Sequence, residues 1–181
     1  GLQRTGTKIV VSVHDIRRAM GIVNRRYENR ELRLIYRTAD ALFVHSLAQA
    51  TDLEQFAGVD RARIHVVPHG PYDSGEAREG REAIRRRYGL PLDRQVALFF
   101  GQLRDEKNLD LLLRAMLRHH DWLHLLAAGP AGARGHRTAT YYRGVAEELG
   151  VAGSVHFVNR FIPEEEVPDL FEACERVPLP Y

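Results

Sequence analysis

A short loop in the second half of the sequence carries the residue types that bind phosphate. Residues 101–107 read GQLRDEK, with Arg104 and Lys107 just ahead of a predicted helix that begins at Asn108. Helix-start N–H groups carry partial positive charge, Gly101 permits a close backbone approach, and the two cations suit phosphate oxygens. The loop therefore predicts an anion site, with two exposed loop charges as the alternative. Its spacing matches neither a P-loop nor a GxGxxG fingerprint.

His14 is the second candidate for chemistry, because it directly follows the strand-like run KIVVSV and precedes Asp15. A histidine at a strand end can hold a substrate or exchange protons near neutral pH, but it can equally cap a helix or be satisfied within a loop. The chain has nine histidines, and none has the sequence spacing of a metal-ligand set. His119 and His120 are adjacent, and His124 lies on the next predicted element. We therefore expect no metal.

The elements that must position these residues alternate between short apolar strands and longer helices, which indicates β-α-β units and parallel sheets. The strands are too continuous in Val, Ile, Leu and Phe for a one-sided antiparallel sheet. Predicted strands cover residues 8–13, 41–44, 64–67, 96–100, 123–127 and 154–158, and another starts within 177–181. Predicted helices cover residues 26–38, 47–56, 81–88, 109–120, 138–149 and 164–174.

Ligands of open parallel sheets bind beyond the carboxyl ends of the strands. Both candidates above fall at such ends. The remaining strand-end loops are residues 45–46, 69–70, 129–134 and 159–163. Loops 101–107, 129–134 and 159–163 are expected to converge at one edge of the second sheet.

A break in the alternation divides the chain. Residues 68–80 (PHGPYDSGEAREG) are rich in Gly and Pro and nearly free of apolar residues, which predicts an interdomain linker. Residues 1–67 are then one α/β domain and residues 81–181 a second. Each is expected to be incomplete, because a three-stranded parallel sheet leaves apolar surface uncovered and residues 177–181 read as the start of another strand. We expect this chain to be a fragment.

Composition excludes several classes of protein. The 26 basic and 24 acidic residues of the 181 leave a net charge of +2, which does not favour a nucleic-acid partner. The 44% of hydrophobic residues can build an ordinary globular core. No apolar run approaches the ~20 residues of a membrane-spanning helix, and we expect a cytoplasmic location. The single cysteine, Cys174, is expected to be structural.

A basic stripe offers a second possible surface. The predicted helix 26–38 places four arginines along one face: Arg26, Arg30, Arg33 and Arg37. Such a stripe can meet acidic lipid headgroups, which would put the protein at the inner face of the membrane as a peripheral component. The alternative is a solvated face balanced by Glu28 and Glu31.

Taken in order, the strand-end segments resemble retaining GT-B glycosyltransferases of group 1, family 4. The matching segments are KIVVSVHD, ADALFVHSLAQATDL, RIHVVPHGPYD, ALFFGQLRDEKNLDLLLRAM, LLAAGP and SVHFVNRFIPEEEVPDLFEACERVPLPY. The resemblance covers nearly the whole chain. It implies two Rossmann-like parallel-sheet domains facing each other across a cleft. Residues 1–67 would be the C-terminal part of the acceptor-side domain, and residues 81–181 a donor-binding domain truncated at its C-terminal end.

The resemblance also implies roles for individual residues. Arg104 and Lys107 would clamp the donor diphosphate and stabilise the charge on the leaving group without a metal or other cofactor. His14 would approach the donor sugar and acceptor across the cleft, so that domain closure assembles the site. His69 and Gly70 would shape the crossover. The positions expected to contact the nucleotide are Gly101, Gly129 and the loop residues Arg160, Phe161 and Ile162.

Two departures from the family pattern bear on these roles. Many relatives carry arginine directly after the strand glycine, where this chain has Gln102, so we assign the phosphate contact to Arg104. The E-x7-E motif of the family lies beyond its PY dipeptide, where this chain ends. Glu164 and Glu172 have the spacing but precede the last predicted strand and are expected to lie on a helix surface. Without that motif and the glycine-rich loop of the first domain, we expect this chain alone to be inactive.

The sequence leaves three functions open. The first is transfer of a sugar from a UDP- or GDP-type donor to an acceptor with retention of configuration. A second is a non-catalytic GT-B-like module that binds a nucleotide or a partner protein. A third is a nucleotide-sugar epimerase of the same architecture. The sugar, the base and the acceptor, whether glycan, lipid or small molecule, are not specified by the sequence.

Overall fold

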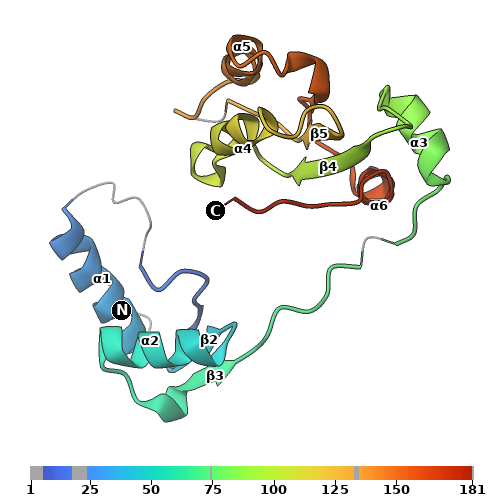
Figure 1. Cartoon of the computed structure of the whole chain (residues 1–181). Helices are drawn as coiled ribbons and strands as arrows, with labels where there is room; N and C mark the ends of the chain where they lie inside the picture. The colour runs from blue at the N-terminus through green and yellow to red at the C-terminus, as the bar shows by residue number, and fades with distance from the viewer. Residues whose placement is uncertain (1–5, 18–23, 74, 133–134, 181) are drawn as a thin grey trace. The chain divides into compact units, whose positions relative to one another are not determined.

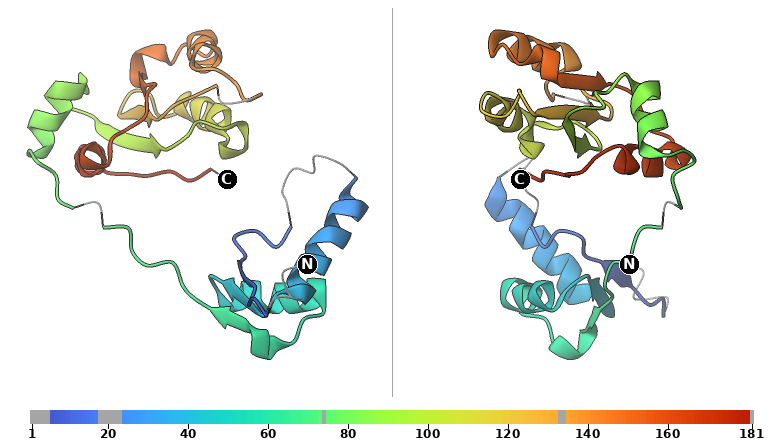
Figure 2. Two further views of the ribbon diagram at one scale, coloured as in Figure 1. Left: turned by 180° about the vertical axis from the view of Figure 1, so that it is seen from behind. Right: turned by 45° about the vertical axis from the view of Figure 1, so that its right-hand side comes forward.

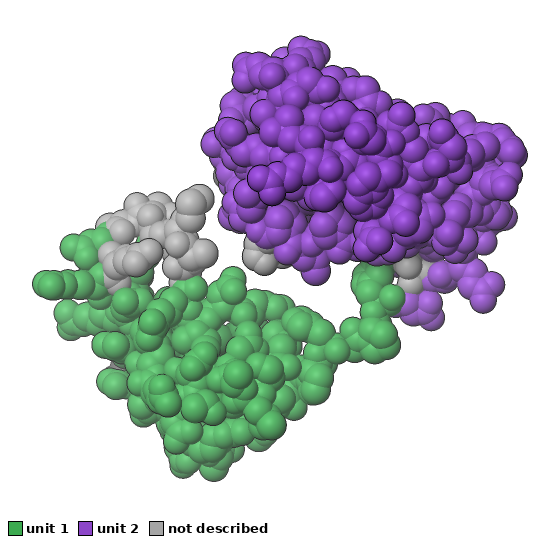
Figure 3. Space-filling model, viewed as in Figure 1, with its two compact units in different colours: residues 1–72 green, residues 73–181 purple. Residues whose placement is uncertain are grey.

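The computed structural model describes residues 6–17, 24–73, 75–132 and 135–180 of the chain (Figure 1). The chain divides into two compact units, unit 1 (residues 1–72) and unit 2 (residues 73–181), which Figure 3 shows in different colours. The point of division falls within residues 68–80, the predicted linker. Tyr181, the last residue of the predicted strand start, lies outside the described residues.

Unit 1 is a parallel three-stranded sheet in the order β1-β2-β3, covered by two helices. Its strands are β1 (Val10–Ser12), β2 (Ala41–Val44) and β3 (Ile64–Val66), and its helices are α1 (Arg25–Thr38) and α2 (Leu47–Ala57), with a 3₁₀ turn, η2 (Arg61–Arg63), before β3. The register places Leu42 beside Val11 on one side and Ile64 on the other. The order and type of these elements are the predicted ones, and β2 has its predicted bounds. The strand β1 is three residues shorter than the predicted strand 8–13, and β3 is one residue shorter than the predicted strand 64–67.

Local capping fixes where the two helices of unit 1 begin and end. The Asn24 side chain accepts the N–H of Arg26, and the Ser46 hydroxyl oxygen accepts the N–H of Gln49. Gly58 ends α2 with a φ of +61°, in the left-handed region that favours glycine. Both helices therefore begin and end within one residue of their predicted bounds, 26–38 and 47–56.

One face of the first sheet is buried and the other is not. Leu42 and Val44 pack with residues of α1 and α2 in a single core. On the opposite face Phe43 is 37% and Val10 54% exposed. Parallel sheets are normally covered on both faces, so this face of unit 1 has the apolar surface that the sequence analysis expects of a three-stranded sheet.

Unit 2 is a second parallel sheet, in the order β4-β5-β6. Its strands are β4 (Gln95–Phe100), β5 (Leu123–Ala128) and β6 (Val155–Val158). Its helices are α3 (Arg81–Tyr88), α4 (Leu109–Met116), α5 (Ala139–Glu148) and α6 (Val167–Glu172), with 3₁₀ turns η3 (Asp105–Lys107), η4 (Ala152–Ser154) and η5 (Glu164–Glu166). The α/β architecture with two parallel sheets is the predicted one.

Both faces of this second sheet are covered. Alternate β4 residues point to opposite faces, so that Ala97 and Phe99 pack with α4 and α5 while Val96 and Leu98 pack with α3 and α6. Figure 2 shows the two pairs of helices on either side of the strands. Burial on both faces explains why these strands are continuously apolar.

Three predicted helices of unit 2 are shorter in the structure, and α5 is so by only one residue at each end. The helix expected over 109–120 ends at Met116, and the following residues form turns in which His119 and His120 donate their N–H groups to the Met116 carbonyl. The helix expected over 164–174 is the 3₁₀ turn η5 followed by α6, which has proline near its first turn. The spacing of apolar residues can continue beyond the last helical hydrogen bond, so it does not locate the end of a helix.

Instead of the predicted last strand, the described residues show one isolated parallel bridge at its start. Arg176 forms a parallel bridge with Ala97 at the free edge of β4. The Leu98 N–H donates to the Arg176 carbonyl at 2.8 Å, and the Glu175 N–H donates to the Val96 carbonyl at 2.9 Å. The segment thus begins to pair beside β4.

The predicted arginine stripe on α1 is exposed, but two of its four side chains also bond to the end of α2. The Arg33 Nε donates to the Phe56 carbonyl at 2.9 Å, and the Arg37 Nε donates to the Ala57 carbonyl at 2.6 Å. These two side chains satisfy carbonyls at the C-terminal end of α2, which favours positive charge there. All four arginines are exposed, and Arg26 and Arg30, nearest the N-terminus of α1, are called the exposed basic pair below. Among the described helices, none has the length and apolar character needed to cross a membrane.

A buried histidine in β5 makes the stability of unit 2 depend on pH. His124 is 8% exposed, and its Nε2 has no hydrogen-bond partner among the described residues. Burial lowers the pKa of His124 to about 4, assisted by the positive charges of His156 and Arg94. In the unfolded chain a histidine pKa is about 6.5. Only the unfolded state therefore binds a proton between these two values.

We expect the free energy of unfolding to be highest above pH 6.5 and to decrease as the pH falls through 4, by about 2 to 3 kcal/mol from this residue. His124→Leu removes the titrating group and should flatten this part of the profile in urea unfolding between pH 7 and 4. His119→Gln, which alters an exposed histidine of the same unit, is the control and should leave the profile as it is. An unchanged slope in His124→Leu would contradict the assignment.

Candidate functional site

Backbone hydrogen bonds join the strand-end loops of unit 2 at one edge of the sheet. The Gly101 N–H donates to the Ala128 carbonyl at 2.9 Å, and the Gly129 N–H donates to the Val158 carbonyl at 3.0 Å. Farther out, Leu103 N–H donates to the Pro130 carbonyl and Ala131 N–H to the Asn159 Oδ1, both at 2.9 Å. The loops that follow β4, β5 and β6 therefore converge as the parallel topology predicts.

These loops enclose a pocket of about 370 Å³, which we call the strand-end pocket. Its lining residues are Phe100, Gly101, Gln102, Gly129, Pro130, Phe161 and Ile162. Four of the five positions expected to contact a nucleotide are among them. Phe161 is 77% exposed, whereas Ile162 is buried. An exposed aromatic ring at the mouth of an apolar pocket is suited to stacking on a planar base.

Two glycines allow the loops to approach so closely. Gly101 has a φ of +99° and Gly129 a φ of +143°, both in the region that L side chains avoid. A Cβ atom on Gly129 would lie 2.0 Å from the carbonyl oxygen of Gly101. Any side chain at this position would separate the two loops.

Lys107 lies directly over the strand glycine. Its Nζ donates to the Phe100 carbonyl at 3.3 Å and would lie 2.9 Å from a Cβ atom on Gly101. Partial burial lowers the pKa of Lys107, and the nearby charge of Arg104 lowers it further, although Glu106 acts in the opposite direction. The negative charge of a bound anion would offset both the cost of desolvation and the repulsion between the two cations, so the electrostatics favour an anion here.

Arg104 lies on the same loop but farther into solvent. Its Nε donates to Gln102 Oε1 at 2.8 Å, and its Nη1 is 3.7 Å from Glu106 Oε1. The Gln102 that replaces the family arginine thus contacts the arginine two positions later. Arg104 and Lys107 belong to one turn, which supports their assignment to one anion.

The helix α4 begins at the predicted residue, Leu109, and a 3₁₀ turn precedes it. Residues 105–107 form the turn η3, Asn108 adopts a φ of +55°, and the α-helix begins at Leu109. The Asn108 side chain donates to the Pro180 carbonyl, and no side chain caps α4 within the described part of the chain. The start of α4 therefore follows the two cations without a side-chain cap, although the Leu111 N–H donates to the Asn108 carbonyl at 3.1 Å.

Asp105 holds this turn in place. Its Oδ1 accepts the N–H of Arg137 at 2.9 Å and the hydroxyl of Tyr142 at 3.4 Å. Burial, and then the charge of Asp105, raise the pKa of Tyr142 to about 12, so the phenol remains a hydrogen-bond donor. Asp105 anchors the loop to α5 and is a positioning residue that sequence reasoning did not single out.

Arg160 is the one predicted nucleotide contact outside the pocket lining. Its guanidinium pairs with the carboxylate of Glu166, which also accepts the Tyr88 hydroxyl at 2.7 Å. The hydrogen bond that Arg160 donates to Glu166 raises the pKa of Arg160. Its side chain is therefore engaged within unit 2, and its expected backbone contact with a base stays a prediction.

Three other residues considered from the sequence have no role in this pocket. Glu164 and Glu172 are exposed, and Glu172 Oε1 lies 3.8 Å from the Nε of Arg81. Cys174 is buried, which raises its pKa to about 12 and keeps it as an unreactive thiol.

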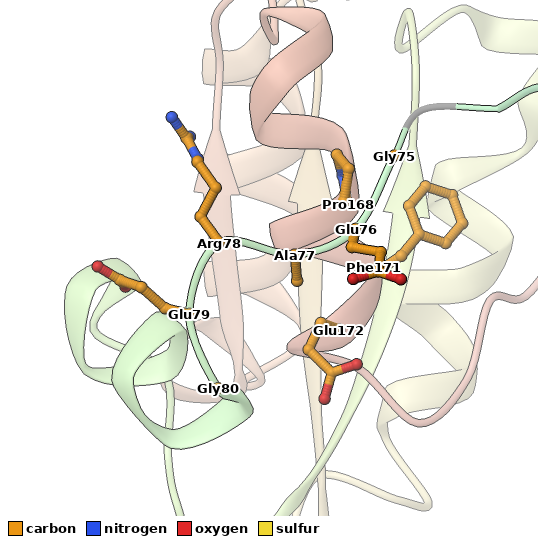
Figure 4. Close-up of a pocket in the computed structure, with 9 residues that line it drawn as sticks. All are labelled: Gly75, Glu76, Ala77, Arg78, Glu79, Gly80, Pro168, Phe171 and Glu172. Carbon is orange, nitrogen blue, oxygen red and sulfur yellow. The ribbon is translucent and has the colours of Figure 1, made fainter.

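A larger hollow of unit 2, of about 780 Å³, lies between linker residues 75–80 and helix α6 (Figure 4). Besides those linker residues it is lined by Pro168, Phe171 and Glu172. Glu76, Glu79 and Glu172 give it three carboxylates, which disfavour a diphosphate. None of the predicted nucleotide contacts lines it, so we assign the anion site to the strand-end pocket.

His14 lies in unit 1, and the structure surrounds it with two histidines that sequence spacing did not connect to it. His14, His45 and His69 follow β1, β2 and β3 respectively, and one side-chain nitrogen of each lies within 4.8 Å of the others. His45 Nε2 is 3.2 Å from His14 Nδ1. The available signal was their shared position after successive parallel strands, not their separation in sequence.

Comparison with protein families identifies matches over both units. Residues 80–180 match the family model described as glycosyl transferases group 1, and residues 1–70 match a glycosyl transferase 4-like domain. The chain is 32% identical over 144 residues to D-inositol 3-phosphate glycosyltransferase of Mycolicibacterium smegmatis, covering 78% of this chain and 32% of that protein. It is 34% identical over 146 residues to the enzyme of the same name from Mycobacterium tuberculosis, covering 78% of this chain and 29% of that protein.

Solved structures show the same fold. Anabaena HepE in complex with UDP and glucose aligns with a TM-score of 0.79 at 19% identity, over 97% of this chain and 47% of that chain. Sucrose-phosphate synthase from Thermosynechococcus elongatus aligns with a TM-score of 0.75 at 19% identity, over 94% of this chain and 44% of that chain. The chain spans about a third of the length of the curated relatives it matches.

Proposed function

Because this chain belongs to the glycosyl transferases of group 1 and has their GT-B fold, we propose that the whole protein transfers a sugar from a UDP- or GDP-type donor to an acceptor with retention of configuration. The observation that carries the proposal is the strand-end pocket, whose apolar walls and exposed Phe161 adjoin the two cations of loop 101–107. A nucleoside diphosphate has both parts that this arrangement accepts, a planar base and two phosphates.

The geometry suggests how the reaction is assisted. When the bond between the sugar C1 and the diphosphate oxygen breaks, negative charge develops on the leaving group, while the acceptor hydroxyl oxygen bonds to C1 and gives its proton to the departing diphosphate. Lys107 and Arg104 are placed to stabilise that charge, together with the first N–H groups of α4. His14, in unit 1, is assigned to the donor sugar and acceptor by its match to the family histidine.

The relatives named for D-inositol 3-phosphate make a cyclitol phosphate the first acceptor to test. Transfer to it from a labelled nucleotide sugar, in the full-length protein, would support the transferase proposal. Release of free nucleotide without an acceptor would favour the epimerase, and nucleotide binding without turnover would favour the binding module.

Calorimetric titration of the 181-residue chain with UDP, GDP and ADP tests the donor site without requiring turnover. We expect a uridine or guanosine diphosphate to bind, and Phe161→Ala to weaken its binding by roughly 5- to 150-fold, because stacking on one base contributes about 1 to 3 kcal/mol. Trp122→Ala is the matched control, since this aromatic residue is also exposed but precedes β5 at the amino edge of the sheet. Equal losses in both variants, or no binding at all, would contradict the assignment.

The exposed basic pair of α1 supports a peripheral contact with an anionic membrane. Tyr27 and Leu34, 58% and 63% exposed, lie beside Arg26 and Arg30 on this helix. We expect sedimentation with phosphatidylserine vesicles at low salt, and its loss in Arg26→Glu/Arg30→Glu, because each basic residue near such a surface contributes about 1 kcal/mol. Arg114→Glu/Arg118→Glu makes the same charge change in unit 2 and should sediment like the unaltered chain. Absence of sedimentation at low salt would remove the membrane proposal.

A further inference from the structure

Three histidines form a cluster at the carboxyl edge of the first sheet, which we call the histidine cluster: His14, His45 and His69. The order β1-β2-β3 and the parallel direction bring the three strand ends to the same edge. The rings of His45 and His69 stack with centroids 3.7 Å apart at 23°, and those of His14 and His45 are 4.9 Å apart. A side-chain nitrogen from each lies within 4.8 Å of the other two.

Hydrogen bonding fixes which nitrogen of His45 can bind a ligand. His45 Nδ1 is 3.0 Å from the Val67 carbonyl oxygen, and a carbonyl oxygen only accepts. Nδ1 therefore carries a proton, and in the neutral ring Nε2 keeps its lone pair, 3.2 Å from His14 Nδ1. Anchoring of one ring nitrogen to a backbone carbonyl is how metal-binding histidines are usually oriented.

The separation of these two nitrogens matches a chelating pair. Metal–nitrogen bonds of about 2.0 to 2.1 Å in tetrahedral geometry place two ligand nitrogens about 3.3 Å apart. His45 Nε2 and His14 Nδ1 are 3.2 Å apart. The third ligand nitrogen belongs to His69 and lies within 4.8 Å of the other two. A side-chain rotation would bring it to the metal, and because His14 and His69 are both exposed, that rotation disturbs no core packing.

A side chain of α2 holds the first two ligands in register. Gln49 Oε1 accepts the N–H of His45 at 2.7 Å, and Gln49 Nε2 donates to the carbonyl oxygen of His14 at 3.1 Å. One amide thus bridges the backbones of two residues that are 31 positions apart in sequence. The cluster is preorganised by the fold and does not depend on chance contact between surface side chains.

We propose that His14, His45 and His69 form a binding site for a divalent transition-metal ion of the zinc type. Three neutral imidazoles suit zinc, nickel or copper and do not suit magnesium or calcium, which prefer oxygen ligands. Since the site is partly exposed, a fourth position faces solvent and can take water or an oxygen of a bound molecule, as in open three-histidine sites. The proposal departs from the expectation of no metal, because that expectation used spacing within single elements only.

Calorimetric titration of the 181-residue chain with Zn²⁺ tests the site, with Mg²⁺ as the negative probe. We expect one Zn²⁺ per chain and a loss of affinity of at least about 100-fold in each of His14→Ala, His45→Ala and His69→Ala. The controls are His65→Ala, on the exposed face of β3, and His119→Ala/His120→Ala, an adjacent pair in unit 2. Retained affinity in the three single variants, or an equal loss in the controls, would overturn the proposal.

Nuclear magnetic resonance of the unaltered chain tests the metal site without relying on variants that could fail to fold. With ¹⁵N-labelled histidine, addition of Zn²⁺ should shift the ring signals of three of the nine histidines, and the metal-free chain should show His45 with its proton on Nδ1. Shifts confined to the histidines of unit 2 would refute the site. Because nucleotide binding is not part of this measurement, its outcome is separate from that of the donor-site titration.

Discussion

Removal of both cations from loop 101–107, in Arg104→Ala/Lys107→Ala, is expected to abolish sugar transfer by the full-length protein. Each group is placed to stabilise charge on the leaving diphosphate, and loss of one such donor typically lowers kcat by about 10²- to 10³-fold. Together we expect a decrease of at least about 10⁴-fold. The same variant of the 181-residue chain should bind a nucleoside diphosphate at least about 100-fold more weakly, since hydrogen bonds to charged groups contribute about 1.5 to 3 kcal/mol each.

The control for this variant makes the same change in net charge away from the pocket. Arg114→Ala/Arg118→Ala removes two positive charges from exposed positions on and just after α4. It should retain both turnover and nucleotide affinity, and both double variants should unfold at the same urea concentration. Normal turnover in the Arg104/Lys107 variant would refute the diphosphate role of the loop.

Addition of one methyl group at Gly129 is expected to have the largest structural effect on the pocket. The Cβ atom would lie 2.0 Å from the carbonyl oxygen and 2.6 Å from the carbonyl carbon of Gly101, and backbone atoms cannot move aside as a flexible side chain can. The φ of +143° adds strain for any L side chain. We expect Gly129→Ala to lose about 3 kcal/mol of unfolding free energy and its measurable affinity for the nucleotide.

Gly144→Ala provides a control that is expected to raise the free energy of unfolding instead of lowering it. Gly144 lies within α5, and a Cβ atom there would meet no heavy atom within 4 Å. Replacement should stabilise the helix by about 0.5 to 1 kcal/mol and leave nucleotide binding unchanged. Urea unfolding and calorimetry on the two alanine variants would separate a local clash from a general effect of losing glycine. Wild-type nucleotide affinity in Gly129→Ala would contradict the close approach of the two loops.

Much of the architecture follows from local patterns. The strand β2 (Ala41–Val44) and the helix α3 (Arg81–Tyr88) have their predicted bounds, because an apolar run or a helical period ends there at polar or glycine residues. Helix α4 was predicted too long, since the apolar periodicity of residues 109–120 does not reveal where the backbone turns. Local signals give the kind and order of elements more accurately than their ends.

The sequence by itself determined the alternation of strands and helices, the family and the loop that carries Arg104 and Lys107, because each of these depends on neighbours along the chain. Only the tertiary structure decided that Arg33 and Arg37 bond to α2, that Arg160 pairs with Glu166, and that three histidines share one edge. These contacts depend on side-chain direction and on distances between separate strands. A pattern of residue types constrains where a side chain is attached, but packing determines what it touches.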